Sequence, residues 1–165
     1  IEFIAHSFVR DKEDVLAIMF DMNALWEEYV YVLLKKHLQN DWKISAQQKK
    51  RFWEWKTVRP DIVMTSKNAD RGVVVIDTKW KRVEDNKPSD ADLKQMYVYN
   101  HYWDAKQSIL LYPRTRKQRD TAGKYRLLMN EQVHQCMLGF VDVLKDGQLN
   151  RSLAEEILNK IDIVQ

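Results

Sequence analysis

Cysteine, glycine and proline are scarce in this sequence, and long apolar runs are missing. The single cysteine, Cys136, cannot close an internal disulfide, so a disulfide-built secreted domain is excluded and a cytoplasmic protein is expected. With four glycines and three prolines, element boundaries must come from hydrophobic periodicity. The longest strongly apolar run, residues 29–34, is far shorter than the roughly 20 residues that span a bilayer, so no membrane segment is expected.

What the sequence does contain is enough apolar material for a core. Apolar residues make up 45% of the 165 residues and aromatic residues 11%, which excludes global disorder. The length suits one domain, so we expect residues 1–165 to fold as a single unit. The first residue is Ile1 rather than Met, and we interpret the chain as the C-terminal part of a longer protein. The net charge of +3 permits an anionic partner without demanding one.

Periodicity predicts an α/β protein. We expect a helix over about residues 14–37, with a possible second start at Asp21, and helices from Ser89 to about residue 103 and after a capping box at Ser152 and Glu155. Strands are expected within residues 42–58, over 61–65 and 73–78 as a hairpin, and over 108–112, 125–129 and 134–143. This order predicts a central mixed β-sheet flanked by α-helices.

The hairpin carries charge where apolar residues are expected. Asp61 begins one apolar strand, and Asp77 follows four aliphatic residues in the next. Pairing of the two strands brings these carboxylates together, and a divalent cation between them would relieve their repulsion; Mg²⁺ prefers such oxygen ligands. Since alternate strand residues share a face, Lys79 points the same way as Asp77 and Thr78 the opposite way.

Two helices add further candidates. Around the predicted first helix, Glu27 lies slightly closer to the buried stripe than Glu28, so Glu27 is the better candidate to reach the carboxylate pair. In the helix after the hairpin, Gln95 and Tyr99 are four residues apart and share a face.

These motifs carry a family resemblance. Pro60-Asp61 followed after 15 residues by Asp77-Thr78-Lys79 resembles the PD-(D/E)xK nuclease superfamily, and the Gln-x-x-x-Tyr that follows resembles the fourth motif of its RecB-like branch. With the blocks at residues 21–30, 59–63, 75–81, 92–99 and 110–113, the run from about residue 14 to 143 resembles the McrC catalytic domain. McrC is the nuclease subunit of the McrBC 5-methylcytosine-dependent restriction system.

The resemblance implies a restriction-endonuclease-like fold and Mg²⁺-dependent hydrolysis of DNA phosphodiesters, with Mn²⁺ able to substitute. On this reading Asp61, Asp77 and the Thr78 carbonyl bind the metal, Lys79 and Glu27 complete the catalytic set, and Gln95 and Tyr99 orient the substrate. It also implies a partner, an AAA+ GTPase like McrB. By the same resemblance, we expect the large N-terminal part with which McrC proteins engage that GTPase to lie outside these residues.

Other functions are compatible with the same candidate residues. A RecB-like exonuclease or a junction resolvase would differ only in substrate, and a non-catalytic module would bind DNA or a partner without cleaving. Two basic groups are candidates for phosphate contacts: residues 49–51 with Lys56 and Arg59, and the loop with Arg114, Arg116, Lys117, Arg119 and Lys124. Strand alternation places Trp53 and Trp55 on opposite faces, so we expect at most one to face DNA and the other to pack in the core.

Overall fold

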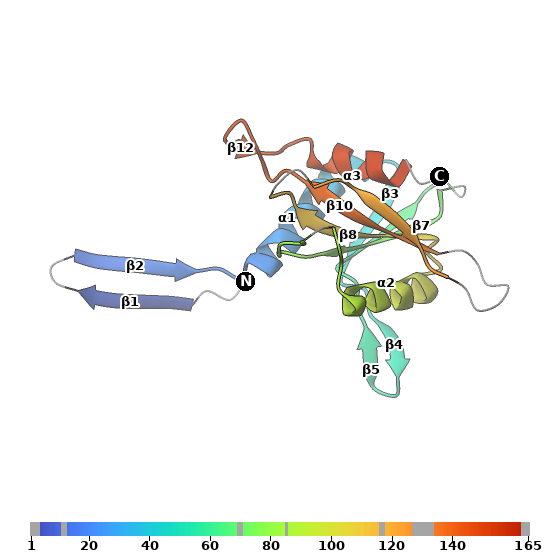
Figure 1. Ribbon diagram of the computed structural model, residues 1–165, viewed down its shortest axis with the longest axis horizontal. Coiled ribbons are helices and arrows are strands. Elements are labelled where there is room, and N and C mark those ends of the chain that lie inside the picture. Colours follow the sequence, from blue (N-terminus) through green and yellow to red (C-terminus); the bar gives the residue numbers. More distant parts are fainter. Residues whose placement is uncertain are drawn as a thin grey trace.

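The computed structural model describes residues 4–10, 13–68, 71–84, 86–115, 118–126 and 134–162 (Figure 1). Its helices are α1 (Met22–Leu38), α2 (Asp90–Trp103) and α3 (Leu153–Asp162). The strands before α2 are β1 (Ile4–Arg10), β2 (Glu13–Met19), β3 (Trp42–Ala46), β4 (Lys50–Trp53), β5 (Lys56–Val58), β6 (Ile62–Ser66) and β7 (Val73–Thr78). Those after it are β8 (Gln107–Pro113), β9 (Thr121–Lys124), β10 (Gln135–Val141), β11 (Leu144–Lys145) and β12 (Gln148–Leu149).

A six-stranded mixed sheet forms the centre, in the order β3-β6-β7-β8-β10-β9. Strand β6 pairs antiparallel with β3 and β7, whereas β7, β8 and β10 run parallel to one another. The short strands β4 and β5 pair only with each other and form a separate hairpin between β3 and β6. The predicted α/β fold with a central mixed sheet is therefore confirmed.

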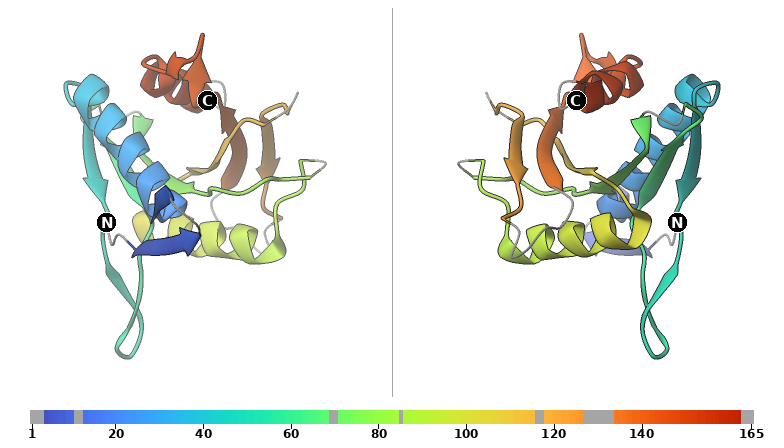
Figure 2. Two further views of the ribbon diagram at one scale, coloured as in Figure 1. Left: turned by 90° about the vertical axis from the view of Figure 1, so that its left-hand side faces the viewer. Right: turned by 90° about the vertical axis from the view of Figure 1, so that its right-hand side faces the viewer.

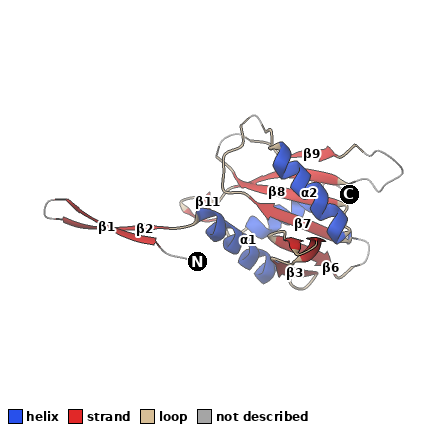
Figure 3. Ribbon diagram, turned by 90° about the horizontal axis from the view of Figure 1, so that it is seen from below, coloured by secondary structure: helices blue, strands red, loops and turns tan. Residues whose placement is uncertain are grey.

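Helices cover both faces of this sheet. Helices α1 and α3 pack on one face and α2 on the other, as Figures 2 and 3 show. In β7, Val74 and Ile76 contact the α1 and α3 side, while Val75 packs in the cluster formed with α2. Because strand side chains alternate, Asp77 follows Val75 onto the α2 face. No helix in the described ranges is long and apolar enough to cross a membrane.

The first helix begins later than predicted. Residues 13–19 form strand β2, paired with β1 through Phe8 and Val15, so the predicted helix over residues 14–21 is wrong. A short apolar run fits a strand as well as a helix turn, and here the pairing partner decides. The alternative start is confirmed: Asp21 is the N-cap, and its carboxylate accepts hydrogen bonds from the backbone N–H groups of Asn23 and Ala24.

Three smaller predictions also need correction. Within residues 42–58 the sequence also suggests a basic loop at residues 49–51, but Lys50 and Arg51 lie in strand β4. Tyr125 lies outside any strand, just after β9, and residues 127–129 of the strand predicted there lie outside the described residues. The hydroxyl of Ser152 contacts Asn150 and Glu156 instead of forming a capping box with Glu155, because Asn150 already satisfies the Ser152 backbone N–H.

Candidate active site

The β6–β7 register brings the two predicted carboxylates to the same end of the hairpin. Ile62 pairs with Ile76, so Asp61 and Asp77 are the next opposing positions along the ladder. Asp77 is buried, and Asp61 is half-buried. Asp61 Oδ2 accepts hydrogen bonds from the Thr78 backbone N–H (2.7 Å) and hydroxyl (2.8 Å), which fix its orientation.

Lys79 joins Asp77 on the α2 face. Lys79 Nζ lies 2.6 Å from Asp77 Oδ2, an ion pair by distance, although Oδ2 receives no hydrogen bond of good geometry. The Lys79 backbone N–H donates to the carbonyl of Leu111 at 2.9 Å, which extends the β7–β8 pairing past the end of β7. This bond holds Lys79 in strand-like alternation, so its side chain points as the sequence predicted.

Helix α2 supplies a chain of hydrogen bonds to the ammonium. Lys79 Nζ donates to Gln95 Oε1 (3.2 Å), and Gln95 Nε2 donates to the Tyr99 hydroxyl (2.7 Å). That hydroxyl donates to the backbone carbonyl of Arg59 (2.9 Å), two residues before Asp61. Gln95 and Tyr99 therefore lie on one helix face, beside the carboxylate pair.

Burial and neighbouring charge oppose ionisation of Asp77. Desolvation, followed by the charge of Asp61, raises the pKa of Asp77 to about 6, and Lys79 only partly offsets this. For Lys79, burial acts to lower the pKa, but the Asp77, Asp92 and Asp61 carboxylates outweigh it and raise the pKa. The site thus holds a lysine that is charged at neutral pH beside a carboxyl group, Asp77, whose pKa of about 6 is above its ordinary value.

Glu27 reaches the same region from α1. Its Oε1 accepts a hydrogen bond from Gln47 Nε2 at 2.8 Å, and the Gln47 backbone N–H donates to the Asp61 carbonyl at 2.8 Å. Burial, and to a lesser extent the charge of Asp61, raises the pKa of Glu27 despite the Gln47 hydrogen bond. Glu28 is exposed. Of the two glutamates, Glu27 is the one directed toward the carboxylate pair.

Sequence reasoning missed Asp92, Lys81 and Gln47. Asp92 is buried at the start of α2, 2.6 Å from Lys81 Nζ and 3.8 Å from Lys79 Nζ. The charged contacts with Lys81, together with the Ser89 hydroxyl, lower the pKa of Asp92 even though burial acts to raise it. Asp92 appears in the sequence as an ordinary first-turn acid, and only the fold reveals its two lysine partners.

The side chains of the candidate site supply some, but not all, of the ligands that a divalent cation needs. Asp77 Oδ2 is a buried carboxylate oxygen that receives no hydrogen bond of good geometry, although Lys79 Nζ lies 2.6 Å away, and a cation can satisfy such an atom. In the described part of the chain, no group of three or more His, Cys, Asp or Glu side chains could hold a metal ion. A cation at Asp61 and Asp77 would therefore complete its shell with backbone, water or substrate oxygens, as Mg²⁺ commonly does.

The structure shows how Arg114 of the predicted basic loop is held and where the two tryptophans lie. The Arg114 guanidinium donates hydrogen bonds to the carbonyl of Gln118 in the same loop and to the carbonyl of Phe140 in β10. Arg114 therefore holds this loop against the sheet. Arg116 and Lys117 lie outside the described residues. Trp53 and Trp55 are both exposed and contact each other, so the prediction that one would enter the core is wrong. Glu54 and Trp55 form the turn between β4 and β5, where strand alternation no longer applies.

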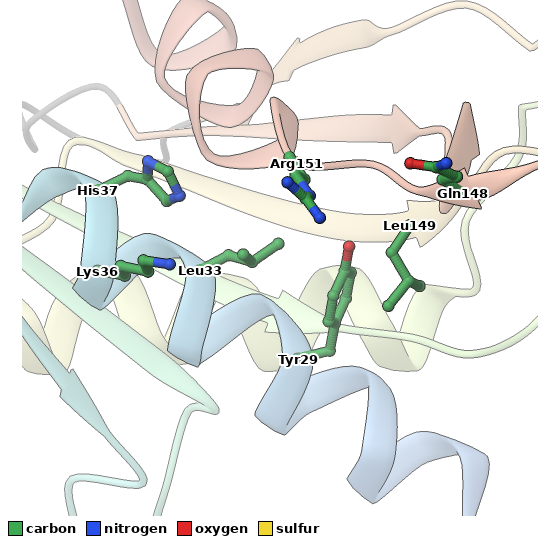
Figure 4. Close-up of a pocket in the computed structure, with 7 residues that line it drawn as sticks. All are labelled: Tyr29, Leu33, Lys36, His37, Gln148, Leu149 and Arg151. Carbon is green, nitrogen blue, oxygen red and sulfur yellow. The ribbon is translucent and has the colours of Figure 1, made fainter. Parts of the chain in front are cut away.

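The pocket in Figure 4 lies apart from these carboxylates. Its volume is about 840 Å³, and it lies between α1 and the β12 region. The lining residues are Tyr29, Leu33, Lys36, His37, Gln148, Leu149 and Arg151. None of them contributes to the contacts among Asp61, Asp77 and Lys79, and we assign the chemistry to those contacts rather than to this pocket.

Comparison with known proteins relates this chain to a family. Residues 4–113 match the family model described as McrBC 5-methylcytosine restriction system component. A solved structure matches with a TM-score of 0.66 and 21% identity over 90% of this chain and 34% of that chain. It is a refined half-complex from a tetradecameric assembly of Thermococcus gammatolerans McrB AAA+ hexamers with bound McrC. This chain thus spans about a third of the matching one. Among curated proteins no significant match was found.

Proposed function

The chain belongs to the McrBC 5-methylcytosine restriction system component family, and we propose that it is the Mg²⁺-dependent endodeoxyribonuclease of such a system. The observation that carries the proposal is the convergence of Asp61, Asp77 and Lys79 at one end of the β6–β7 hairpin. Two carboxylates with an adjacent ammonium are the groups that metal-assisted hydrolysis of a phosphodiester requires. We place this activity in the cytoplasm, where the target DNA lies.

The acidic residues bind and orient in this proposal. Asp61 and Asp77 hold the cation with the Thr78 carbonyl, and the hydrogen bonds from Thr78 fix the Asp61 carboxylate in place. When bound, Mg²⁺ lowers the pKa of a coordinated water and neutralises charge on the phosphate. Glu27, oriented by Gln47, faces Asp61 and extends the acidic surface toward α1.

Lys79 acts in this proposal on the negative charge that develops on the phosphate. Its ammonium stays protonated at neutral pH and can stabilise the transition state electrostatically. Gln95 accepts a hydrogen bond from the ammonium, and the Tyr99 hydroxyl accepts one from Gln95. The DNA backbone is oriented by the same Gln95 and Tyr99 pair, which lies beside the reacting groups.

Control by a GTPase belongs to the same proposal. The structure of similar fold contains McrC bound to McrB AAA+ hexamers. We propose that an AAA+ GTPase of that kind also works with the protein of which these residues form the nuclease part. The match covers 34% of the other chain, and we propose that the contacts that dock such a GTPase lie mainly in the part of the protein that this match leaves uncovered.

Cleavage of closed circular DNA tests the function. The protein, with its GTPase partner, GTP and Mg²⁺, should linearise or nick methylated covalently closed plasmid, and EDTA should abolish the reaction. Cleavage restricted to DNA with free ends would instead identify a RecB-like exonuclease, and cleavage restricted to four-way junctions a resolvase. DNA binding without cleavage under every metal condition would identify a non-catalytic module and refute the proposal.

A further inference from the structure

The β4–β5 hairpin stands apart from the sheet. It is inserted between β3 and β6, pairs only with itself, and extends beyond α2 on the side away from α3 (Figures 1 and 2). All but one of the residues in its strands are exposed. A two-stranded ribbon of this kind is marginally stable by itself, so its projection calls for a stabilising contact or a function.

The tip of the hairpin is aromatic. Trp53 is 58% exposed and Trp55 is 73% exposed, and their ring centroids are 5.8 Å apart. Phe52 is also exposed, at 51%, and its ring contacts Tyr102 of α2. Large apolar side chains grouped on a protruding tip are typical of a binding surface.

Charge along the hairpin favours an anionic partner. Residues 48–59 contain five basic residues and one acid, Glu54. Lys49, Arg51, Lys56 and Arg59 are all exposed. Basic side chains interleaved with exposed aromatic rings favour nucleic acid as the partner, because the cations contact phosphates and the apolar rings can contact sugars and base edges.

Helix α2 fixes the root of the hairpin. Lys50 Nζ donates to the Tyr102 carbonyl at 2.5 Å and lies 5.0 Å from the centroid of the Trp103 ring. Trp103 Nε1 donates to Gln48 Oε1 at 2.9 Å, and the Tyr102 hydroxyl donates to the Phe52 carbonyl at 3.3 Å. The ribbon is thus held in one direction before any partner binds, which reduces the entropy lost on binding.

Both ends of the hairpin lead into the candidate site. Gln47, just before it, contacts Glu27 and the Asp61 backbone, while Arg59, just after it, accepts the Tyr99 hydrogen bond and precedes Asp61 by two residues. At about 3.3 Å per residue, six residues of strand carry Trp55 at most about 20 Å from Asp61. Half a turn of B-DNA is about 17 Å long, so the tip can reach duplex next to a phosphate held at the site.

We propose that the β4–β5 hairpin is a DNA-binding arm of the nuclease, with Trp53 and Trp55 packed against the sugars and the groove edges of the bases in the duplex flanking the scissile phosphate. Arg51 and Lys56 contact the phosphates on either side of the tip. This inference rests on the proposed function, since its ligand is the DNA that the site cleaves. The arm would contact the DNA at a place that the catalytic residues do not reach.

The test compares three double variants for binding of a fluorescent duplex in EDTA, using the protein at its full natural length. Trp53→Ala/Trp55→Ala should bind at least tenfold more weakly, with the salt dependence unchanged, because apolar contact is lost without a phosphate contact. Arg51→Gln/Lys56→Gln should also bind more weakly and should reduce the salt slope by about two. Leu144→Ala/Leu149→Ala is the matched control, because this exposed apolar pair lies on the separate β11–β12 hairpin.

The outcomes distinguish failure of the proposed DNA-binding arm from failure of the proposed nuclease function. Wild-type cleavage of plasmid together with duplex binding by Trp53→Ala/Trp55→Ala within twofold of wild type would refute the arm and leave the nuclease intact. A change in sedimentation of this variant with unchanged DNA binding would identify a protein interface and also refute the arm. Wild-type protein that neither binds nor cleaves DNA would refute both proposals. Loss of binding in the tryptophan variant, with normal melting temperature and normal binding by the leucine control, supports the arm.

Discussion

Lys79 and Asp77 form the ion pair at the centre of the candidate site, with Lys79 Nζ 2.6 Å from Asp77 Oδ2. That oxygen is the one that a cation would also use, so a bound cation and the ammonium compete for it. Lys79 has other partners in place, because Gln95 Oε1 lies 3.2 Å away and Asp92 Oδ1 3.8 Å away. Helix α2 can therefore keep the ammonium beside the site when its contact with Asp77 weakens.

Lys79→Ala should abolish cleavage without unfolding the protein. The ammonium acts mainly in the transition state, so plasmid nicking should fall by at least about 100-fold, while DNA affinity and melting temperature stay close to wild type. Lys79→Arg should fail similarly, because a planar guanidinium does not replace a compact ammonium.

Lys81→Ala is the matched control for Lys79. Lys81 is exposed and pairs with Asp92 rather than with the carboxylate pair, so its loss should reduce nicking only a few-fold. Nicking that survives Lys79→Ala but not Lys81→Ala would mean that the catalytic ammonium is assigned to the wrong lysine.

Asp77→Asn should raise the stability of the metal-free protein while removing its cation site. The pKa of Asp77 is raised from 3.8 to about 6, so ionisation at pH 7 costs the folded state about 3 kcal/mol, which the amide avoids. Chemical denaturation in EDTA at pH 7 should show a gain of about 1–3 kcal/mol, and calorimetry should show no Mn²⁺ binding. Mn²⁺ affinity equal to wild type would contradict the assignment of Asp77 as a ligand.

The same raised pKa fixes the sign of the pH dependence. Folded Asp77 keeps its proton up to about pH 6 whereas unfolded Asp77 loses it near 3.8, so its contribution to stability is fully present below pH 3.8 and is lost as the pH rises through 6. The stability gain of Asp77→Asn should accordingly shrink as the pH falls from 7 to 4. Mn²⁺ affinity of the wild type should fall about tenfold per unit below pH 6, because protons compete for the carboxylate.

Glu27→Gln should impair cleavage more than Glu28→Gln does. The glutamine oxygen can still accept the hydrogen bond from Gln47, so the fold should persist while the negative charge facing Asp61 is lost. Glu28 is exposed on the adjacent position, and its neutralisation should leave nicking within about twofold of wild type. Equal effects of the two variants would show that Glu27 has no special role at the site.

Residues 1–165 alone should not stimulate GTP hydrolysis by the AAA+ partner. The structural match to the McrC-containing complex spans only 34% of the other chain, which leaves most of that chain available for docking. Adding this polypeptide to the purified GTPase should leave its turnover unchanged, whereas the protein at full natural length should raise it. Strong stimulation by residues 1–165 would place the docking surface within them.

The β6–β7 hairpin, α2 and the direction of Lys79 could all be predicted from the amino-acid sequence. Strand alternation and pairing are local rules, so Asp61, Asp77 and Lys79 could be grouped without a structure. Helical spacing likewise placed Gln95 and Tyr99 on one face. The resemblance to McrC, carried by five ordered motifs, is confirmed at the level of the family.

The residues that surround this group could not be predicted, because they depend on packing between elements far apart in the sequence. Asp92, Lys81 and Gln47 contact the site because α2 packs across the sheet and β3 pairs with β6, and no local pattern encodes those distances. The strand over residues 13–19 likewise depends on pairing with β1, which overrides a spacing that also fits a helix. Trp53 and Trp55 share one exposed tip because the chain turns between them, and a turn breaks the alternation from which their opposite faces were predicted.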